Sequence, residues 1–178
     1  MKILMLDVDG VLNSKQHFLM TKGDKIPSAD TLSDADLFTM KRDTNKNNMW
    51  CLGYILDNVP DLKIVISSSW RNHYSLESFK ELFKIYGLDG DRIIGKTPRK
   101  FSSTRANEIH FWLQDFTEDK ENSMPRWIVL DDHKIFELHS AEELNEVLTD
   151  NWVGLTLPDA FKVIKHFKPE FKEPIIMI

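Results

Sequence analysis

The chain has 178 residues, a formal net charge of −5 and a hydrophobic content of 42%. This composition excludes disordered, collagen-like and disulfide-rich proteins, and the single cysteine, Cys51, excludes an internal disulfide or a zinc cluster built on cysteines. The acidic balance argues against a general nucleic-acid coat, and no apolar run approaches the roughly 18–20 residues of a membrane span. We therefore expect one domain over 1–178, a cytoplasmic location and no membrane partner.

Apolar runs that alternate with helical patterns predict an α/β fold with a parallel sheet. Strands are expected at 3–6, 62–66, 92–94 and 127–130, with a weaker fifth at 152–155. Helices are expected at 48–58, 75–86, 103–116, 141–148 and 158–167, where apolar residues recur at helical spacing. The strands are near-continuous apolar runs, which favours a three-layer, Rossmann-like arrangement with helices on both faces of the sheet.

Three stretches depart from this alternation. Residues 13–47 are polar and are expected to form a flap over one sheet edge, with a hairpin near 37–40. Residues 117–126 are expected to form an exposed loop. The C-terminal tail, 168–178, ends in an apolar run that we expect to pack on the domain or on a partner.

An acid pair directly follows the first predicted strand. Asp7 and Asp9 flank a single residue and precede Gly10, which allows a sharp turn. Ligands bind at the carboxyl ends of parallel strands, and two converging carboxylates favour a hard cation such as Mg²⁺. The alternative is an acidic turn without a ligand. A calcium loop does not fit, because Phe18 stands where its twelfth-position glutamate would be.

Two further strand ends carry polar groups. Ser67 and its neighbours follow the second strand and predict an anion cradle, with a helix N-cap as the alternative. Asp131 and Asp132 follow the fourth strand, where an N-cap is the alternative for Asp132. A cation stands between them in the sequence; the candidates are Lys96, Arg99, Lys100 and Arg105, of which Arg105 is the best placed.

The order of acid pair, hydroxyl, cation and acid pair resembles that of the haloacid dehalogenase (HAD) superfamily. Asp7-Val-Asp-Gly-Val resembles its first motif, Ser67 its second, Arg105 its third and Asp131-Asp132 its fourth. A narrower resemblance is to the HAD-like domains of Swiss Army Knife RNA repair proteins. The sequence segments that carry this resemblance are Asp-Val-Asp-Gly-Val-Leu-Asn, Ile-Ser-Ser-Ser-Trp-Arg, Ile-Ile-Gly-Lys-Thr-Pro, Arg-Ala-Asn-Glu-Ile-x-x-Trp-Leu, Val-Leu-Asp-Asp and Gly-Leu-Thr.

The resemblance implies a Mg²⁺-dependent phosphatase. It makes Asp7 the nucleophile and Asp9 the general acid and base, with the Asp9 carbonyl as a metal ligand. It also makes Asp131 a direct ligand of Mg²⁺, with Asp132 beside it or acting through a water. Ser67, with Ser68 nearby, would hold the phosphoryl group, and Arg105 would neutralise it, with Lys96 as the rival cation.

The substrate implied by the resemblance is phosphorylated and large. About 35 residues separate the first motif from the next helix, too few for a cap domain, so we expect a capless or minimally capped open site. The narrower resemblance favours a polynucleotide end, for which Trp70, Arg71, Arg99 and Lys100 would supply stacking and phosphate contacts near the mouth of the site. Core packing is the alternative for Trp70, and a small nucleotide is the alternative substrate if an oligomer closes the site.

Two other functions remain open on the same scaffold. A phosphotransferase would pass the phosphoryl group to an acceptor other than water. A non-catalytic module would keep the fold and bind phosphate or Mg²⁺, although the intact acids argue against it. A response-regulator receiver does not fit, because its phosphoacceptor follows a middle strand of the chain and not the first.

Overall fold

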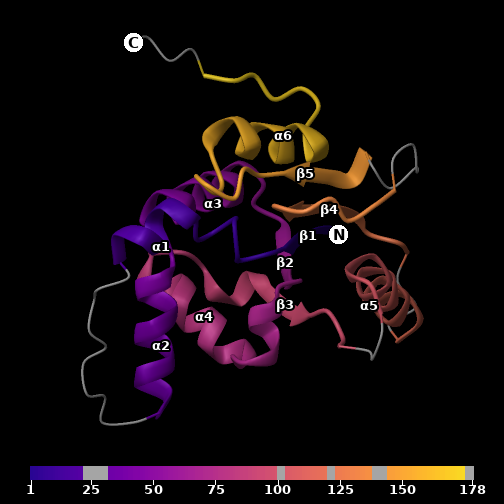
Figure 1. Cartoon of the computed structure of the whole chain (residues 1–178). Helices are drawn as coiled ribbons and strands as arrows, with labels where there is room; N and C mark the ends of the chain where they lie inside the picture. Colours follow the sequence, from indigo (N-terminus) through magenta and orange to yellow (C-terminus); the bar gives the residue numbers. More distant parts are fainter. Residues whose placement is uncertain (22–31, 100–102, 120–122, 138–143, 175–178) are drawn as a thin grey trace.

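The computed structural model, which describes residues 1–21, 32–99, 103–119, 123–137 and 144–174, is built around one parallel sheet (Figure 1). Its order is β3-β2-β1-β4-β5. The strands are β1 Lys2–Leu6, β2 Leu62–Ile66, β3 Ile93–Lys96, β4 Arg126–Asp131 and β5 Glu146–Leu148. Every neighbouring pair is parallel, so all carboxyl ends meet at one edge. The predicted α/β class is confirmed.

Helices cover both faces of the sheet. The helices are α1 Lys15–Thr21, α2 Leu32–Asp43, α3 Lys46–Asn58, α4 Leu76–Ile85, α5 Arg105–Asp119 and α6 Leu157–Phe167, with short 3-10 turns η1 Ser69–Asn72 and η2 Gly90–Arg92. Leu4 and Leu6 pack in the core formed with α3, α4 and α6, whereas Ile3 and Met5 pack in the core formed with α5. This alternation follows from the two-residue period of a strand. Figure 1 shows α5 alone on one side of the sheet.

The helix boundaries follow local chemistry. Asn45 and Ser75 cap α3 and α4 by accepting backbone hydrogen bonds from Asn47 and Ser78. Thr104 accepts a hydrogen bond from the backbone N–H of Asn107 at the start of α5. Pro158 lies in the first turn of α6, which also has a capping box.

The hairpin expected near 37–40 is wrong, because this stretch belongs to α2. Leu37 and Met40, three residues apart, both pack into the core with α3 and α4, and that spacing is helical. In the described part of the region 13–47, α1 packs against α2, and α2 packs against α4 (Figure 1). The loop expected at 117–126 is shorter, since α5 runs to Asp119 and β4 begins at Arg126.

The predictions of a strand at 152–155 and of a helix at 141–148 are also wrong. Residues 146–148 form β5 beside β4, and Leu144, which the helical pattern would bury, is exposed; residues 141–143 lie outside the described residues. Residues 152–155 form a turn closed by a bridge between Asp150 and Gly154, whose φ is +76°. Sheet pairing at an edge thus prevails over a weak helical pattern.

The tail after α6 is described as far as residue 174. Phe171 packs against the core, and the apolar residues 175–178 lie outside the described residues. Within the described part of the chain, the helices include none that is long and apolar enough to cross a membrane.

Candidate active site

The polar residues predicted at three strand ends lie side by side. Leu6 pairs with Ile66 of β2 and with Leu130 of β4, so the next residues, Asp7, Ser67 and Asp131, emerge at the same level. Backbone hydrogen bonds from Asp7 N to Leu130 O (3.0 Å) and from Ser67 N to Leu6 O (2.8 Å) extend this register. The sheet therefore sets the spacing of these side chains.

Arg105, the first residue of α5, joins these strand ends. Its Nη1 lies 3.2 Å from Asp7 Oδ1 and 3.1 Å from Asp131 Oδ2, and it donates to the Ser67 carbonyl. Lys96, the rival cation, donates instead to the carbonyls of Arg71 and Tyr74, at 3.0 Å each. The structure thus brings Arg105 to the acids, whereas the ammonium group of Lys96, at the end of β3, is bound by carbonyls of the segment after β2.

The carboxyl groups of Asp7 and Asp131 are buried together. Burial raises the pKa of Asp7 to about 7, with the nearby Asp131 adding to the rise and Arg105 opposing it. Burial also raises the pKa of Asp131. Asp7 Oδ1 accepts no hydrogen bond from the described residues, although it is within ion-pair distance of Arg105. Two buried acids with one shared guanidinium leave negative charge uncompensated when both are ionised.

These carboxylates fit a divalent cation that prefers oxygen. Asp132 adds a third carboxyl, whose oxygens lie within 4.8 Å of ligand atoms on Asp131 and His133. Asp7 Oδ1 is buried and accepts no hydrogen bond from the described residues, so it is able to bind a cation in addition to its ion pair with Arg105. Carboxylate oxygens suit Mg²⁺, whereas the exposed His133 imidazole suits softer metals and already lies 2.5 Å from Asp132 Oδ1.

Gly10 makes room for Asp132. Its φ is +72°, and a Cβ at this position would meet the Asp132 carboxyl group and lie 2.7 Å from the Asp132 Cβ. Thr149 Oγ1 donates to the Gly10 carbonyl (2.8 Å), and Asn13 Oδ1 accepts from the Gly10 N–H (2.8 Å). The turn after β1 is therefore fixed on both sides.

Asp9 is exposed and is held by three donors. Trp70 Nε1 and Asn13 Nδ2 each donate to Oδ1 at 2.9 Å, and Ser69 Oγ donates to Oδ2 at 3.1 Å. Trp70 is buried, so its indole offers little surface for base stacking and instead orients Asp9. Asp9 also lines a cavity, together with Asn13.

The first two serines of the run are buried beside Asp7. Ser67 and Ser68 are fully buried, and Ser67 Oγ has no hydrogen-bond partner among the described residues. A Ser68 hydroxyl hydrogen bond opposes the rise of the Asp7 pKa. Because an unpaired buried hydroxyl is costly, a hydrogen bond from Ser67 Oγ to a polar ligand at this strand end would be favourable.

The family described as "HAD domain in Swiss Army Knife RNA repair proteins" matches residues 3–160 of the chain. The chain belongs to this family. Membership of the HAD superfamily indicates hydrolase chemistry of the phosphatase type. Neither the curated proteins nor the solved structures that were compared gave a match.

Arg71 of this HAD domain lies behind the site and not at its mouth. It pairs with Glu108 of α5, and each side chain is only 7% exposed; Arg71 also donates to the Ser68 carbonyl. Among the other basic residues expected at the mouth, Arg99 is exposed and Lys100 lies outside the described residues. The sequence motifs did not predict the role of Glu108 as the partner of Arg71, although Glu108 stands one helical turn after Arg105.

Glu108→Ala is expected to lower the free energy of unfolding by about 3–5 kcal/mol, because it leaves the buried Arg71 guanidinium without its partner. The measurement is denaturant unfolding. Glu77→Ala, which removes an exposed partner of Lys80 (3.3 Å), is the matched control and should change stability far less. Equal losses from the two variants would contradict a buried pair.

The stabilisation by Mg²⁺ is expected to grow with pH. The folded-state pKa of Asp7 lies above its ordinary value of 3.8, so the stability that its proton contributes at low pH is lost as pH rises to about 7. Above that pH the Asp7 carboxylate is ionised, and a bound cation would compensate its charge as the proton does at low pH. We expect Mg²⁺ to raise the melting temperature little at pH 5 and clearly at pH 8, as measured by differential scanning fluorimetry. A shift independent of pH would contradict binding at these acids.

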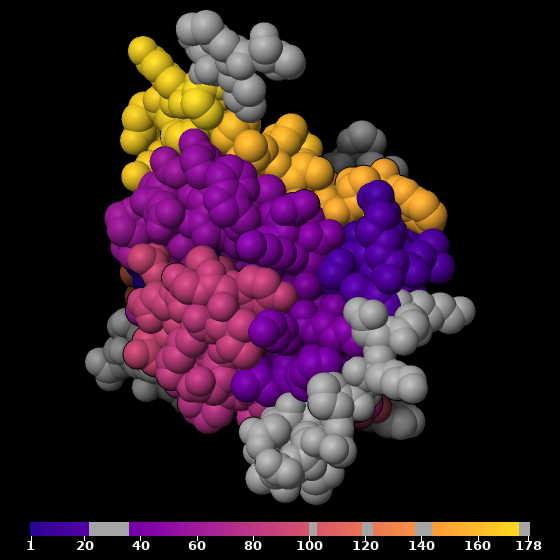
Figure 2. All heavy atoms as spheres, turned by 90° about the vertical axis from the view of Figure 1, so that its left-hand side faces the viewer, coloured from indigo at the N-terminus to yellow at the C-terminus, as the bar shows by residue number. Residues whose placement is uncertain are grey.

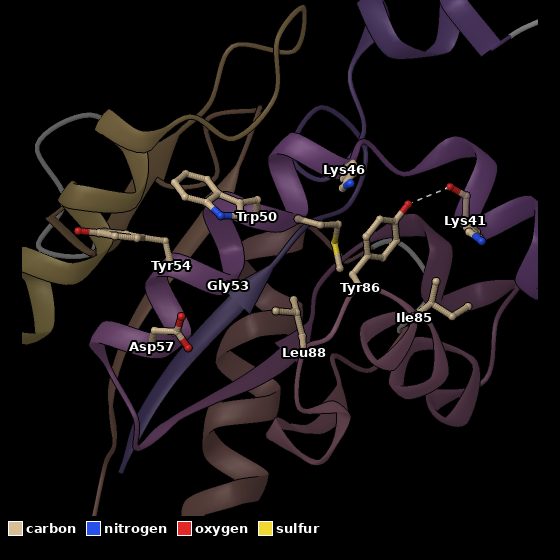
Figure 3. A pocket seen from close by; sticks show the side chains of 10 residues that line it. Lys41, Lys46, Trp50, Gly53, Tyr54, Asp57, Ile85, Tyr86 and Leu88 are labelled. Atoms are coloured by element: carbon tan, nitrogen blue, oxygen red, sulfur yellow. Dashed lines mark hydrogen bonds between the residues drawn. The ribbon is translucent and has the colours of Figure 1, made fainter. Parts of the chain in front are cut away.

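A larger cavity lies away from the strand-end acids (Figure 3). It measures about 530 Å³ and lies between α3 and the end of α4. Trp50 and Tyr54 of α3 and Tyr86 and Leu88 line it, and the described lining includes none of the site acids. This cavity is therefore separate from the candidate active site, and its exposed Trp50 is available for a control variant.

Proposed function

We propose that the HAD domain is a Mg²⁺-dependent phosphomonoesterase that forms an aspartyl-phosphate on Asp7. The observation that carries the proposal is the Arg105 guanidinium, which joins Asp7, Asp131 and the Ser67 carbonyl at one sheet edge. A nucleophilic carboxylate, a cation and a phosphate cradle need this proximity for phosphoryl transfer. Family membership supports the same chemistry.

In the first step, an Asp7 carboxylate oxygen attacks phosphorus and the bond to the ester oxygen breaks. The leaving oxygen keeps the electron pair and takes a proton from Asp9. In the second step, Asp9 removes a proton from water, which attacks the phosphorus and releases inorganic phosphate and free Asp7. The hydrogen bonds from Trp70 and Ser69 keep the Asp9 carboxyl in one orientation for both transfers.

The remaining groups hold the phosphoryl oxygens. Ser67 Oγ would donate to one of them, and Arg105 would balance their charge. Asp7, Asp131 and Asp132, with the Asp9 carbonyl, would hold Mg²⁺. When bound, the cation supplies positive charge that lessens repulsion between the phosphoryl group and Asp7.

The substrate we propose is a phosphorylated polynucleotide end or nucleotide. The family description, which names RNA repair proteins, supports this class. Trp70 and Arg71 contribute indirectly, since Trp70 holds Asp9 and Arg71 holds the Ser68 carbonyl. Phosphate contacts of a polynucleotide would then come from exposed cations such as Arg99.

The test is phosphate release from an aryl phosphate with Mg²⁺ and with EDTA, followed by 3′- and 5′-phosphorylated oligonucleotides, mononucleotides and phosphopeptides. We expect turnover that EDTA abolishes. An added alcohol would collect the phosphoryl group if the protein were a phosphotransferase. Failure to release phosphate from every member of the panel would leave a binding module and overturn the proposal.

A further inference from the structure

A second cavity, of about 380 Å³, opens directly beside the catalytic acids. Asp9, Gly10 and Asp132 form one wall. The other wall comes from the segment before α1 and from α1 itself, with Asn13, Ser14, Lys15, Phe18 and Leu19. It is completed by Asn151 and Trp152 of the turn after β5. Figure 2 shows α1, in indigo, against the orange segment that contains this turn. The cavity therefore shares Asp9 and Asp132 with the proposed site of phosphoryl transfer.

Its outer wall exposes large apolar side chains. Phe18 is 53% exposed, Leu19 58% and Trp152 50%. Such a grouping beside a polar reaction centre marks a surface for a ligand with an apolar or aromatic part. Asn151 stands in the same lining, and amide side chains pair with the edges of nucleobases.

The wall is held rigidly although its side chains face solvent. Lys15 N donates to Asn151 O (3.0 Å) and Gln16 N donates to Trp152 O (3.2 Å), which fixes α1 to the turn. Within the turn, Asp150 Oδ1 accepts from Trp152 N at 2.7 Å. Asn48 Nδ2 adds a hydrogen bond of 3.0 Å to the Val153 carbonyl. An aromatic ring on a fixed backbone loses little conformational entropy when it binds a ligand.

We propose that this cavity binds the leaving group of the substrate, and that this group is a nucleoside whose base stacks on Trp152. The inference rests on the proposed function. Asp9, which would protonate the leaving oxygen, lines the cavity, so the group attached to that oxygen lies on this side. The planar base matches the exposed indole in shape and polarity. The nucleoside belongs either to a mononucleotide or to the terminal residue of a phosphorylated oligonucleotide.

The kinetic test compares adenosine 5′-phosphate with ribose 5-phosphate, which lacks the base. Trp152→Ala is expected to lower kcat/KM for the nucleotide about ten- to a hundredfold and to leave ribose 5-phosphate within about twofold. Trp152→Phe should retain most of the activity, because a phenyl ring also stacks. Trp50→Ala, on the larger cavity, removes a tryptophan of similar exposure (59%) and should change neither rate (Figure 3).

The binding test separates this inference from the proposed activity. Adenosine alone is titrated while the indole N–H resonances are followed by NMR, with the Trp152 signal assigned through Trp152→Phe. A selective shift of that signal supports the nucleoside site even if the wild type releases no phosphate. If adenosine does not shift the Trp152 signal even at its solubility limit, the inference is overturned. Equal loss on both substrates in Trp152→Ala would also overturn it, since the turn would then only position Asp9.

Two further measurements distinguish the possible occupants. A 5′-phosphorylated oligonucleotide and adenosine 5′-phosphate are compared in the wild type and in Trp152→Ala. The same fold-loss on both supports one nucleoside site, and a higher wild-type kcat/KM for the oligonucleotide identifies a polynucleotide end as the source. Sedimentation tests the other occupant: a wild-type dimer that Trp152→Ala dissociates would show that a second copy of the chain covers the cavity, and would overturn the inference.

Discussion

Replacing Asp7 by asparagine is expected to lower phosphate release by about 10⁴-fold or more. The amide keeps the size of the side chain and its place at the end of β1, but its oxygen is too weak a nucleophile to attack phosphorus. Asp9→Asn, which removes only the proton donor, should cost less, about 10²- to 10⁴-fold. The measurement is kcat for an aryl phosphate at saturating Mg²⁺.

Unfolding would not explain the loss in Asp7→Asn. The pKa of Asp7, about 7, leaves its carboxyl ionised at pH 8, where it is buried beside Asp131. Asparagine removes that buried charge, so the metal-free variant should melt at or above the wild-type temperature at pH 8, with a smaller difference at pH 5. A variant that kept turnover within tenfold of the wild type would show that Asp7 is not the nucleophile.

The sheet edge that carries the candidate site could be predicted from sequence because its residues follow strongly apolar strands. Ile3 to Leu6, Leu62 to Ile66 and Trp127 to Leu130 are near-continuous runs, and parallel pairing brings Asp7, Ser67 and Asp131 to one level. The pattern could not decide between Arg105 and Lys96. That choice depends on where α5 begins and on the loop after β2, which are set by tertiary contacts.

The wall around Trp152 could not be predicted, because the run Trp-Val-Gly-Leu has the composition of a strand. Gly154, with φ +76°, and Asp150, which accepts from Trp152 N, instead close a turn and leave the indole exposed. The sequence signal that favoured a turn here was the presence of three turn-forming residues, Asp150, Asn151 and Gly154. Asn13 and Glu108 were missed because their role is to hold other side chains, which a linear motif does not reveal.

Gly10→Ala is expected to abolish most of the activity, with a loss of about a hundredfold or more, while the domain stays folded. A methyl group here would overlap the Asp132 carboxyl group, and its distance of 2.7 Å from the Asp132 Cβ is shorter than real side chains allow. The fixed turn cannot retreat, because Thr149 and Asn13 hold both its backbone groups. Asp132 must move, and catalytic groups displaced by about 1 Å lose roughly a hundredfold in rate.

The matched control is Gly87→Ala, since Gly87 has nearly the same backbone angle, φ +76°, but no atom within 4 Å of a Cβ added there. Both variants carry the left-handed strain of alanine, about 1–2 kcal/mol, so their difference isolates the contact with Asp132. Only Gly10→Ala should lose activity and need more Mg²⁺ for half-maximal rate. If both variants lost stability equally and kept full turnover, Asp132 would have no part in holding the cation. If Gly10→Ala lost turnover with an unchanged Mg²⁺ requirement, the displaced group would be Asp9, which directly precedes Gly10 in the same turn.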